Sequence, residues 1–432
     1  MEHWVVGLFL VFFTLELAVE GVLNELNLRY IRERCGPEGI PDDFRGRLSP
    51  EEYRRSVDYA LARGRFQRWA EIYGGAVLLA VLFGGILPRV EELARTLAGR
   101  WNPAWQGPGV LFCFAVALIL VFAGLPTDLY ATFGIEARFG FNKTTPGLYL
   151  ADKAKGLLLG IVLGLPFLWV VLTLMEIAGR FWWLWAFAFI LGFQLLMIVV
   201  YPTLIAPLFN RFEPLEEGEL RDRIEALAAR VGFKTGGIYS MDGSKRSAHS
   251  NAYFTGIGRA KRIVLFDTLI AQMPVDQTLA VLAHEMGHYK MKHVRRMLVL
   301  EGALLFAGLY VLSLLLDYAP FYAAFGLAPS NHAALVLFSL VSGPAVFYLG
   351  PLLNYLSRRH EYEADRFAAL ALGDGRAMEE ALVNLTVKNL ANLTPHPWYS
   401  AYHYSHPTPV ERIRAIRGWD TLRRGATAPL SA

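Results

Sequence analysis

The sequence predicts a mainly α-helical protein that is embedded in a membrane. Of its 432 residues, 54% are apolar and only 19% are charged, and the mean hydropathy is +0.33. Soluble proteins carry charge on about a quarter of their residues, so water is not the only solvent of this chain. Seven apolar stretches are also long enough to cross a hydrocarbon core, which takes roughly 20 helical residues. Together these observations predict a bundle of seven transmembrane helices.

The seven helices follow the order of the apolar stretches. They cover about residues 4–22, 69–88, 109–125, 156–176, 181–203, 297–316 and 333–353. The first stretch is expected to be a retained helix, because Glu16 and Glu20 stand where a signal peptide would have its small-residue cleavage site. The expected divisions of the chain are residues 1–203 with helices one to five, a cytosolic-side segment 204–296, residues 297–353 with the last two helices, and a C-terminal segment 354–432.

The distribution of Lys and Arg predicts the orientation of the chain in the membrane. The segment after the first helix holds ten Arg residues, whereas the next loop has only Arg89, Arg95 and Arg100. Because cytoplasmic loops carry the excess of positive charge, an odd number of spans puts the N-terminus outside. The C-terminus and the 204–296 segment then lie in the cytosol. We expect a prokaryotic inner membrane, or the endoplasmic reticulum membrane if the source is eukaryotic.

Several polar groups interrupt the apolar stretches and predict a wet interior. Glu16, Glu20, Glu71 and Glu301 lie in or beside the spans, and a carboxylate that faces lipid is costly. The helices are therefore expected to enclose a chamber, although Glu71 and Glu301 could instead sit at helix ends in the headgroup region. No Lys/Arg run with interleaved aromatic residues is present, so nucleic acid is not an expected partner. The lipid bilayer is the expected partner.

The segment 278–288 contains the pattern HExxH and predicts a metal site. Pro274 and Asp276 precede it as helix start signals. Four-residue spacing places His284 and His288 one turn apart on one helix face, so that both imidazoles can bind one zinc ion. Glu285 projects beside them, where it can act on a metal-bound water. The alternative is that two histidines and a glutamate merely solvate an ordinary helix. The chain's two cysteines lie far apart, so any metal must use His and carboxylate.

A third ligand is expected in the segment 357–365, directly after the last span. Glu361 and Asp365 share a helix face, so one could bind zinc while the other orients a ligand imidazole. On spacing alone His360, Glu361 and Glu363 remain rivals for the ligand position. A solvated, charged helix start is the alternative for the whole segment.

Two further segments hold candidate functional residues. Near the C-terminus, His406 and Arg412 could stabilise an oxyanion, although a loop histidine before proline is more often an ordinary surface residue. Upstream of the HExxH pattern, residues 237–241, 250–258 and 262–266 are predicted as short strands, and residues 215–233 as an amphipathic helix. An edge strand there could hold an extended peptide. We expect the Asn251 side chain to contact the backbone of such a peptide; the alternative is that Asn251 merely forms a turn.

The motifs in combination resemble those of the CaaX prenyl protease 1 family, the seven-span zinc metalloproteases that process a-factor in yeast and prelamin A in mammals. The likeness covers most of the chain. Its segments are residues 131–145 with the run FGFNKTT, residues 205–215 with APLFNRFEPL, residues 249–254, 284–288 and 361–365, and the pair His406 and Pro407.

The resemblance implies a role for each matching residue. His284, His288 and Glu361 would bind one zinc ion per chain, with Glu285 as the general base. Asp365 would support a ligand histidine, and His406 with Arg412 would assist the transition state. Asn251, with its neighbour Ala252, would bind substrate. The implied fold is mainly α, with seven transmembrane helices around a chamber and a cytosol-facing, zincin-like metalloprotease domain that contains a small β-element.

The resemblance also implies a substrate class. Family members cleave near a prenylated C-terminal cysteine, so a prenylated protein or another membrane-associated peptide is the expected partner, and the oligomeric state stays open. One alternative is the smaller HtpX-like quality-control membrane protease, which has about four spans. The other is a multispan scaffold or transporter whose zinc site is structural, against which the presence of Glu285 argues.

Overall fold

The structure, a computed structural model, describes residues 2–101, 106–256 and 261–427 and is mostly helical. The helices of the membrane part are α1 (Glu2–Glu33), α2 (Pro50–Phe83), α3 (Ile86–Trp101), α4 (Gly107–Leu129), α5 (Pro146–Leu159), α6 (Leu165–Ile177), α7 (Trp182–Val200), α11 (His293–Leu315), α12 (Ala319–Ala323), α13 (Asn331–Val341) and α14 (Gly343–Val346). The others are α8 (Glu219–Arg230), α9 (Asp267–Gln272), α10 (Val275–Lys290), α15 (Gly350–Leu372), α16 (Arg376–Lys388), α17 (Pro397–His403) and α18 (Pro409–Thr427).

Five continuous helical segments are long and apolar enough to span a membrane. They are His3–Glu33, Gly107–Glu136, Pro146–Ile177, Gly179–Leu208 and His293–Leu315, and each coincides with one predicted span. Two bent helix pairs also qualify, so the described residues provide up to seven spans when each pair counts as one. The helical composition, the span count and the small sheet agree with the fold class that the sequence predicts.

The second and seventh predicted spans each contain a break in the helix. The second contains Gly84 and Gly85, and Gly85 has a φ of +68° that residues with a side chain rarely adopt. Helix α2 therefore ends at Phe83, and α3 departs from it at 59°. The seventh breaks near Ser342 with a bend of 43°. Beyond this break α15 continues for 23 residues, well past the predicted end of the span.

A four-stranded sheet lies beyond the membrane helices. Its strands are β1 (Phe212–Pro214), β2 (Ile238–Met241), β3 (Ala252–Thr255) and β4 (Arg262–Phe266), in the order β1-β2-β4-β3. The sequence predicts β2, β3, β4 and the amphipathic helix α8, but not β1, which is only three residues long. Strands β3 and β4 are antiparallel, and β3 is an edge strand. The last two residues of the predicted strand 250–258 lie outside the described residues.

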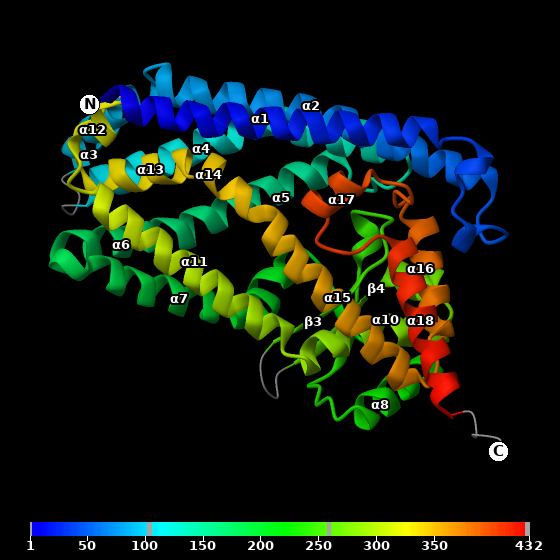
Figure 1. Cartoon of the computed structure of the whole chain (residues 1–432). Helices are drawn as coiled ribbons and strands as arrows, with labels where there is room; N and C mark the ends of the chain where they lie inside the picture. Colours follow the sequence, from blue (N-terminus) through cyan, green and yellow to red (C-terminus); the bar gives the residue numbers. More distant parts are fainter. Residues whose placement is uncertain (1, 102–105, 257–260, 428–432) are drawn as a thin grey trace.

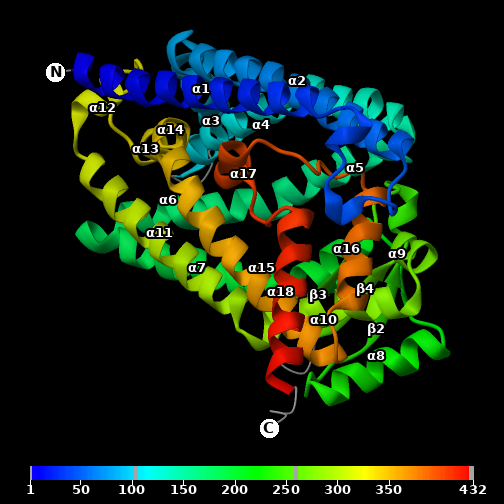
Figure 2. The same cartoon turned by 45° about the vertical axis from the view of Figure 1, so that its right-hand side comes forward.

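The helices form a membrane part and a compact part that share α15. In Figure 1, α1 and α2 run side by side along one border of the molecule, and α6, α7 and α11 lie along the opposite border. Helix α15 crosses from α14 to the sheet, where α8, α10, α16 and α18 gather, and the rotated view in Figure 2 agrees. The largest hydrophobic core lies here, around β4 and α10, with Ile263, Leu265 and Leu282 fully buried.

Two of the carboxylates in the spans turn toward protein groups. Oε2 of Glu20 lies 3.4 Å from Nε2 of His403 in α17. Oε2 of Glu301 in α11 accepts a hydrogen bond of 3.2 Å from Nε2 of Gln194 in α7. Both carboxylates thus contact a polar group on a neighbouring helix.

Helices α10 and α15 approach each other very closely. Small residues are buried on both helices, because Ala280 and Ala283 on α10 and Ala364 and Ala368 on α15 are fully buried. A Cβ atom added at Gly287 would lie only 3.0 Å from Cα and 3.1 Å from the carbonyl oxygen of Ala364. A side chain at position 287 would therefore require the α15 backbone to move away by a few tenths of an ångström.

We expect Gly287→Ala to separate the two helices and to lower the free energy of unfolding by about 1–3 kcal/mol, the usual cost of overpacking. Thermal unfolding of the purified protein in detergent measures the loss. Gly302→Ala in α11 is the matched control, because a Cβ there would meet nothing within 4 Å. Equal melting temperatures for the two variants would contradict the close helix contact.

Candidate metal centre

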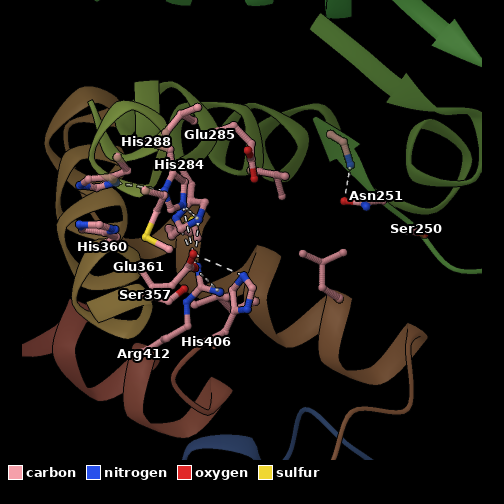
Figure 3. A pocket seen from close by; sticks show the side chains of 18 of the residues that line it. Ser250, Asn251, His284, Glu285, His288, Ser357, His360, Glu361, His406 and Arg412 are labelled. Atoms are coloured by element: carbon pink, nitrogen blue, oxygen red, sulfur yellow. Dashed lines mark hydrogen bonds and ion pairs between the residues drawn. The ribbon is translucent and has the colours of Figure 1, made fainter. Parts of the chain in front are cut away.

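Helix α10 positions the HExxH residues. It begins at Val275 after Pro274, and its apolar face with Leu279, Leu282 and Met286 is buried in the core beside the sheet. Since that face is fixed, His284 and His288 must face α15 one turn apart. Figure 3 shows both imidazoles directed toward Glu361, and the Glu285 carboxylate directed into the pocket on the side of Asn251.

Three potential metal ligands converge between α10 and α15. Nε2 of His284 lies 3.1 Å from Nε2 of His288. The Glu361 carboxylate reaches both rings, with 3.3 Å from Oε2 to Nε2 of His284 and 3.2 Å from Oε1 to Nε2 of His288. One atom from each residue can be chosen so that all three lie within 4.8 Å of one another, and in the described part of the chain no other His, Cys, Asp or Glu group meets this test.

The donor set fits zinc. Two imidazoles and one carboxylate are the ligands of many catalytic zinc sites, which keep a further position for water. Oε2 of Glu361 is also buried and makes no hydrogen bond within the described residues. An unsatisfied buried carboxylate oxygen is costly, and a bound cation would satisfy it.

Asp365 and Arg412 form a buried layer behind this group. Asp365 lies one turn after Glu361 on α15, and its Oδ1 is 2.8 Å from Nδ1 of His284. Nε and Nη2 of Arg412, at the start of α18, donate to the two oxygens of Asp365 at 2.8 and 2.6 Å. Such a bidentate pair compensates the cost of burying both charges. The third guanidinium nitrogen, Nη1, lies 3.6 Å from Glu361.

The buried environment shifts the pKa values of the α10 residues. Burial alone would lower the pKa of His284, but the carboxylates of Asp365 and Glu361 outweigh it and raise this pKa to about 9. Burial raises the pKa of Glu285, although the neighbouring histidines oppose the shift. A raised pKa makes Glu285 a stronger base than an exposed carboxylate.

The pocket beside the metal group has a volume of about 630 Å³ and contains the other predicted site residues. Glu285, Asn251, Ala252, His406 and Arg412 all line it. The His406 side chain is 62% exposed, and its Nε2 lies 3.4 Å from Oε1 of Glu361. Oδ1 of Asn251 accepts a hydrogen bond of 2.8 Å from the Ala252 amide, as in a turn, and the residue stands at the pocket side of the edge strand β3.

The rival ligands His360 and Glu363 belong to a different cluster, centred on His293. His360 stacks on His293 with ring centroids 4.1 Å apart. Oε2 of Glu363 lies 3.1 Å from Nε2 of His293 and 3.2 Å from Nη1 of Arg296. Glu361, by contrast, reaches both HExxH histidines.

Sequence reasoning missed His293. Its Nδ1 lies 3.1 Å from Nδ1 of His288. The contact arises because Lys292 adopts a left-handed conformation with a φ of 60°, so that α11 turns back against the end of α10. The signal in the sequence is a third histidine five residues after the HExxH pattern, in a chain that has only ten histidines. The left-handed turn that makes it useful has no such signal, because Lys is not a residue that favours this conformation.

Comparisons with known proteins agree with this geometry. The family model described as the CAAX prenyl protease N-terminal region with five membrane helices matches residues 31–211, and that of peptidase family M48 matches residues 214–420. The CAAX prenyl protease 1 homolog of Oryza sativa is 36% identical, covering 89% of this chain and 91% of the relative.

Two further comparisons extend the likeness to fungi, in sequence and in structure. CAAX prenyl protease 1 of Saccharomyces cerevisiae is 33% identical, covering 87% of this chain and 88% of the relative. The crystal structure of S. mikatae Ste24p superposes with a TM-score of 0.86 at 32% identity, covering 94% of this chain and 98% of that chain.

These matches bear out the resemblance in the motifs and favour neither the HtpX-like protease nor the scaffold with structural zinc. The M48 model covers the metal group and the pocket, and the N-terminal model covers most of the membrane helices that precede them. The chain therefore belongs to the CAAX prenyl protease 1 family and is a zinc metalloprotease of the membrane.

Proposed function

We propose that this protease cleaves CaaX-type peptides near a prenylated cysteine, or other membrane-associated peptides, with one zinc ion per chain. The observation that carries the proposal is the convergence of His284, His288 and Glu361 beside Glu285, at a pocket that ends on an edge strand. The names of the relatives in rice and yeast support the substrate class.

The residues divide the chemistry among them. Zinc held by the three ligands would act as a Lewis acid that polarises water and the scissile carbonyl. Glu285, with its raised pKa, accepts the proton of the attacking water and later returns it to the leaving amine. His406 is exposed to the pocket and is the better placed donor to the oxyanion. Arg412 contributes its positive charge while it holds Asp365.

The substrate would lie along β3. One edge of this strand pairs with β4, and the other has no strand partner within the described residues. An extended peptide can add to such an edge through main-chain hydrogen bonds. Asn251 and Ala252, which line the same pocket as Glu285, would then hold the peptide next to the reacting carbonyl.

We further propose that the N-terminus lies outside and that the sheet, the metal group and the C-terminus face the cytosol. The excess of Arg in the segment after the first span supports this orientation. The contact between Glu301 and Gln194, with Glu301 also lining the pocket, supports a water-filled chamber that opens to the site.

We expect Glu285→Gln to bind zinc normally but to cleave a farnesylated CaaX peptide about 10²–10⁴-fold more slowly, the usual contribution of a general base. Peptide cleavage by the detergent-purified protein, with and without a zinc chelator, measures this loss, and zinc analysis shows that the site is intact. An unprenylated peptide of the same sequence tests the substrate class. Undiminished cleavage by the variant would remove Glu285 from its role.

His293→Gln should weaken zinc binding about 10–100-fold, the usual effect of removing a partner of a ligand. If Nε2 of His288 faces zinc, its Nδ1 donates to Nδ1 of His293, and His293 donates through Nε2 to Glu363. Competition with a chelator measures the affinity. Glu363→Gln should act in the same direction, whereas His360→Phe keeps the ring stack and should have no effect. A large effect of His360→Phe would assign the loss to packing instead.

Zinc binding should release about one proton near pH 7. Since His284 has a pKa of about 9 without metal, its imidazole is protonated below that pH and the proton competes with zinc. Affinity should therefore rise with pH up to about 9 and then level off. Calorimetric titrations in two buffers of different ionisation enthalpy count the proton. Asp365→Asn should reduce its release, and zinc uptake without proton release in the unaltered protein would contradict the account.

A further inference from the structure

A second pocket lies between α2 and the end of α4, away from the metal group. Its volume is about 510 Å³, and α4 continues here as a π-helical segment, Tyr130–Glu136. Its walls are mainly aromatic and basic. The lining residues are Ala62, Arg65, Phe66, Trp69, Tyr130, Gly134, Ile135 and Arg138.

The charge of this pocket is unbalanced. No carboxylate lines it, and neither Arg65 nor Arg138 has an acidic partner among the described residues. Arg68, three residues after Arg65 on α2, is by contrast paired with Glu25. Glu136, the carboxylate nearest in sequence to Arg138, instead accepts a hydrogen bond of 2.6 Å from the hydroxyl of Tyr59 and lies 3.3 Å from Nε2 of His249. Arg138 also lies over the ring of Phe139, with 5.5 Å from Cζ to the ring centroid. Two guanidinium groups without a carboxylate partner in one pocket provide a site for an anion, and guanidinium matches phosphate oxygens particularly well.

The aromatic residues place the pocket at the membrane boundary. Trp69 is the first residue of the second apolar stretch, and Tyr130 follows the last apolar turn of α4. Their side chains are 71% and 58% exposed. Phe66 packs on Tyr130 with ring centroids 5.1 Å apart. Exposed Trp and Tyr at the ends of spans mark the headgroup level of a bilayer.

We propose that this pocket binds the headgroup of an anionic phospholipid. Arg65 and Arg138 hold the phosphate, and the start of the acyl chains lies against Trp69 and Phe66. Basic pockets between transmembrane helices bind anionic lipid in this way. The bound lipid bridges α2 and the end of α4, where Tyr59, Ile135 and Phe139 form a separate small core. The assignment does not depend on the peptidase chemistry.

Native mass spectrometry of the full-length, detergent-purified protein tests the assignment, with dioleoyl phosphatidylglycerol and dioleoyl phosphatidylcholine as probes. We expect the first phosphatidylglycerol to bind about thirtyfold more tightly than phosphatidylcholine, the equivalent of two surface arginines. Arg65→Gln/Arg138→Gln should remove this preference, and Arg65→Lys/Arg138→Lys should retain part of it. Cleavage of the farnesylated peptide in detergent should not change in either variant.

The matched control removes two exposed arginines elsewhere that have no ion-pair partner among the described residues, Arg54→Gln/Arg230→Gln, and should keep the preference. Equal phosphatidylglycerol binding by the unaltered protein and Arg65→Gln/Arg138→Gln would overturn the site. An equal loss in the control would show that only net charge matters and would overturn it as well. Displacement of the lipid by excess inorganic phosphate would assign the pocket to free phosphate and contradict the lipid assignment.

Discussion

The site depends on the close contact between α10 and α15. Gly287 lets the two helix backbones meet beside Ala364, and Glu361 on α15 lies within 3.3 Å of both Nε2 atoms of the HExxH histidines. Two ligands come from one helix and the third from another, so the metal group exists only when both helices are packed. Because structural zinc sites are closed whereas catalytic sites keep one position open, the open pocket beside the group is what makes this one suitable for catalysis.

Polar support extends outward from both histidines. His284 contacts the carboxylate of Asp365 directly, and Arg412 of α18 donates a hydrogen bond to that carboxylate. His288 is linked to a carboxylate only indirectly, because it contacts His293, which in turn contacts the carboxylate of Glu363. Both imidazoles therefore have a partner for the ring nitrogen that faces away from the metal. Such partners fix the tautomer and orientation of a ligand imidazole. The first network lies within the protein, whereas Arg296 and Arg359 connect the second to the surface.

The sequence predicts a large part of this arrangement because the determining patterns are local. Apolar stretches identify the spans, alternating strands identify β2 to β4, and four-residue spacing pairs His284 with His288. The breaks at Gly85 and near Ser342 escape prediction, because an apolar stretch looks the same whether its helix is straight or bent. Spacing alone also leaves His360, Glu361 and Glu363 as rivals. The choice depends on which face of α15 meets α10, and that is a tertiary contact.

Continuity between membrane and site distinguishes this protease from a soluble zincin. Helix α15 extends from the last span to Glu361 without a loop, and α11 leaves the end of α10 directly for the membrane. X-ray absorption at the zinc edge of the purified protein tests the central claim most directly. The account predicts two imidazoles and oxygen ligands at about 2.0–2.1 Å, with one oxygen ligand altered in Glu361→Gln. A third imidazole, or an unchanged spectrum in that variant, would contradict it.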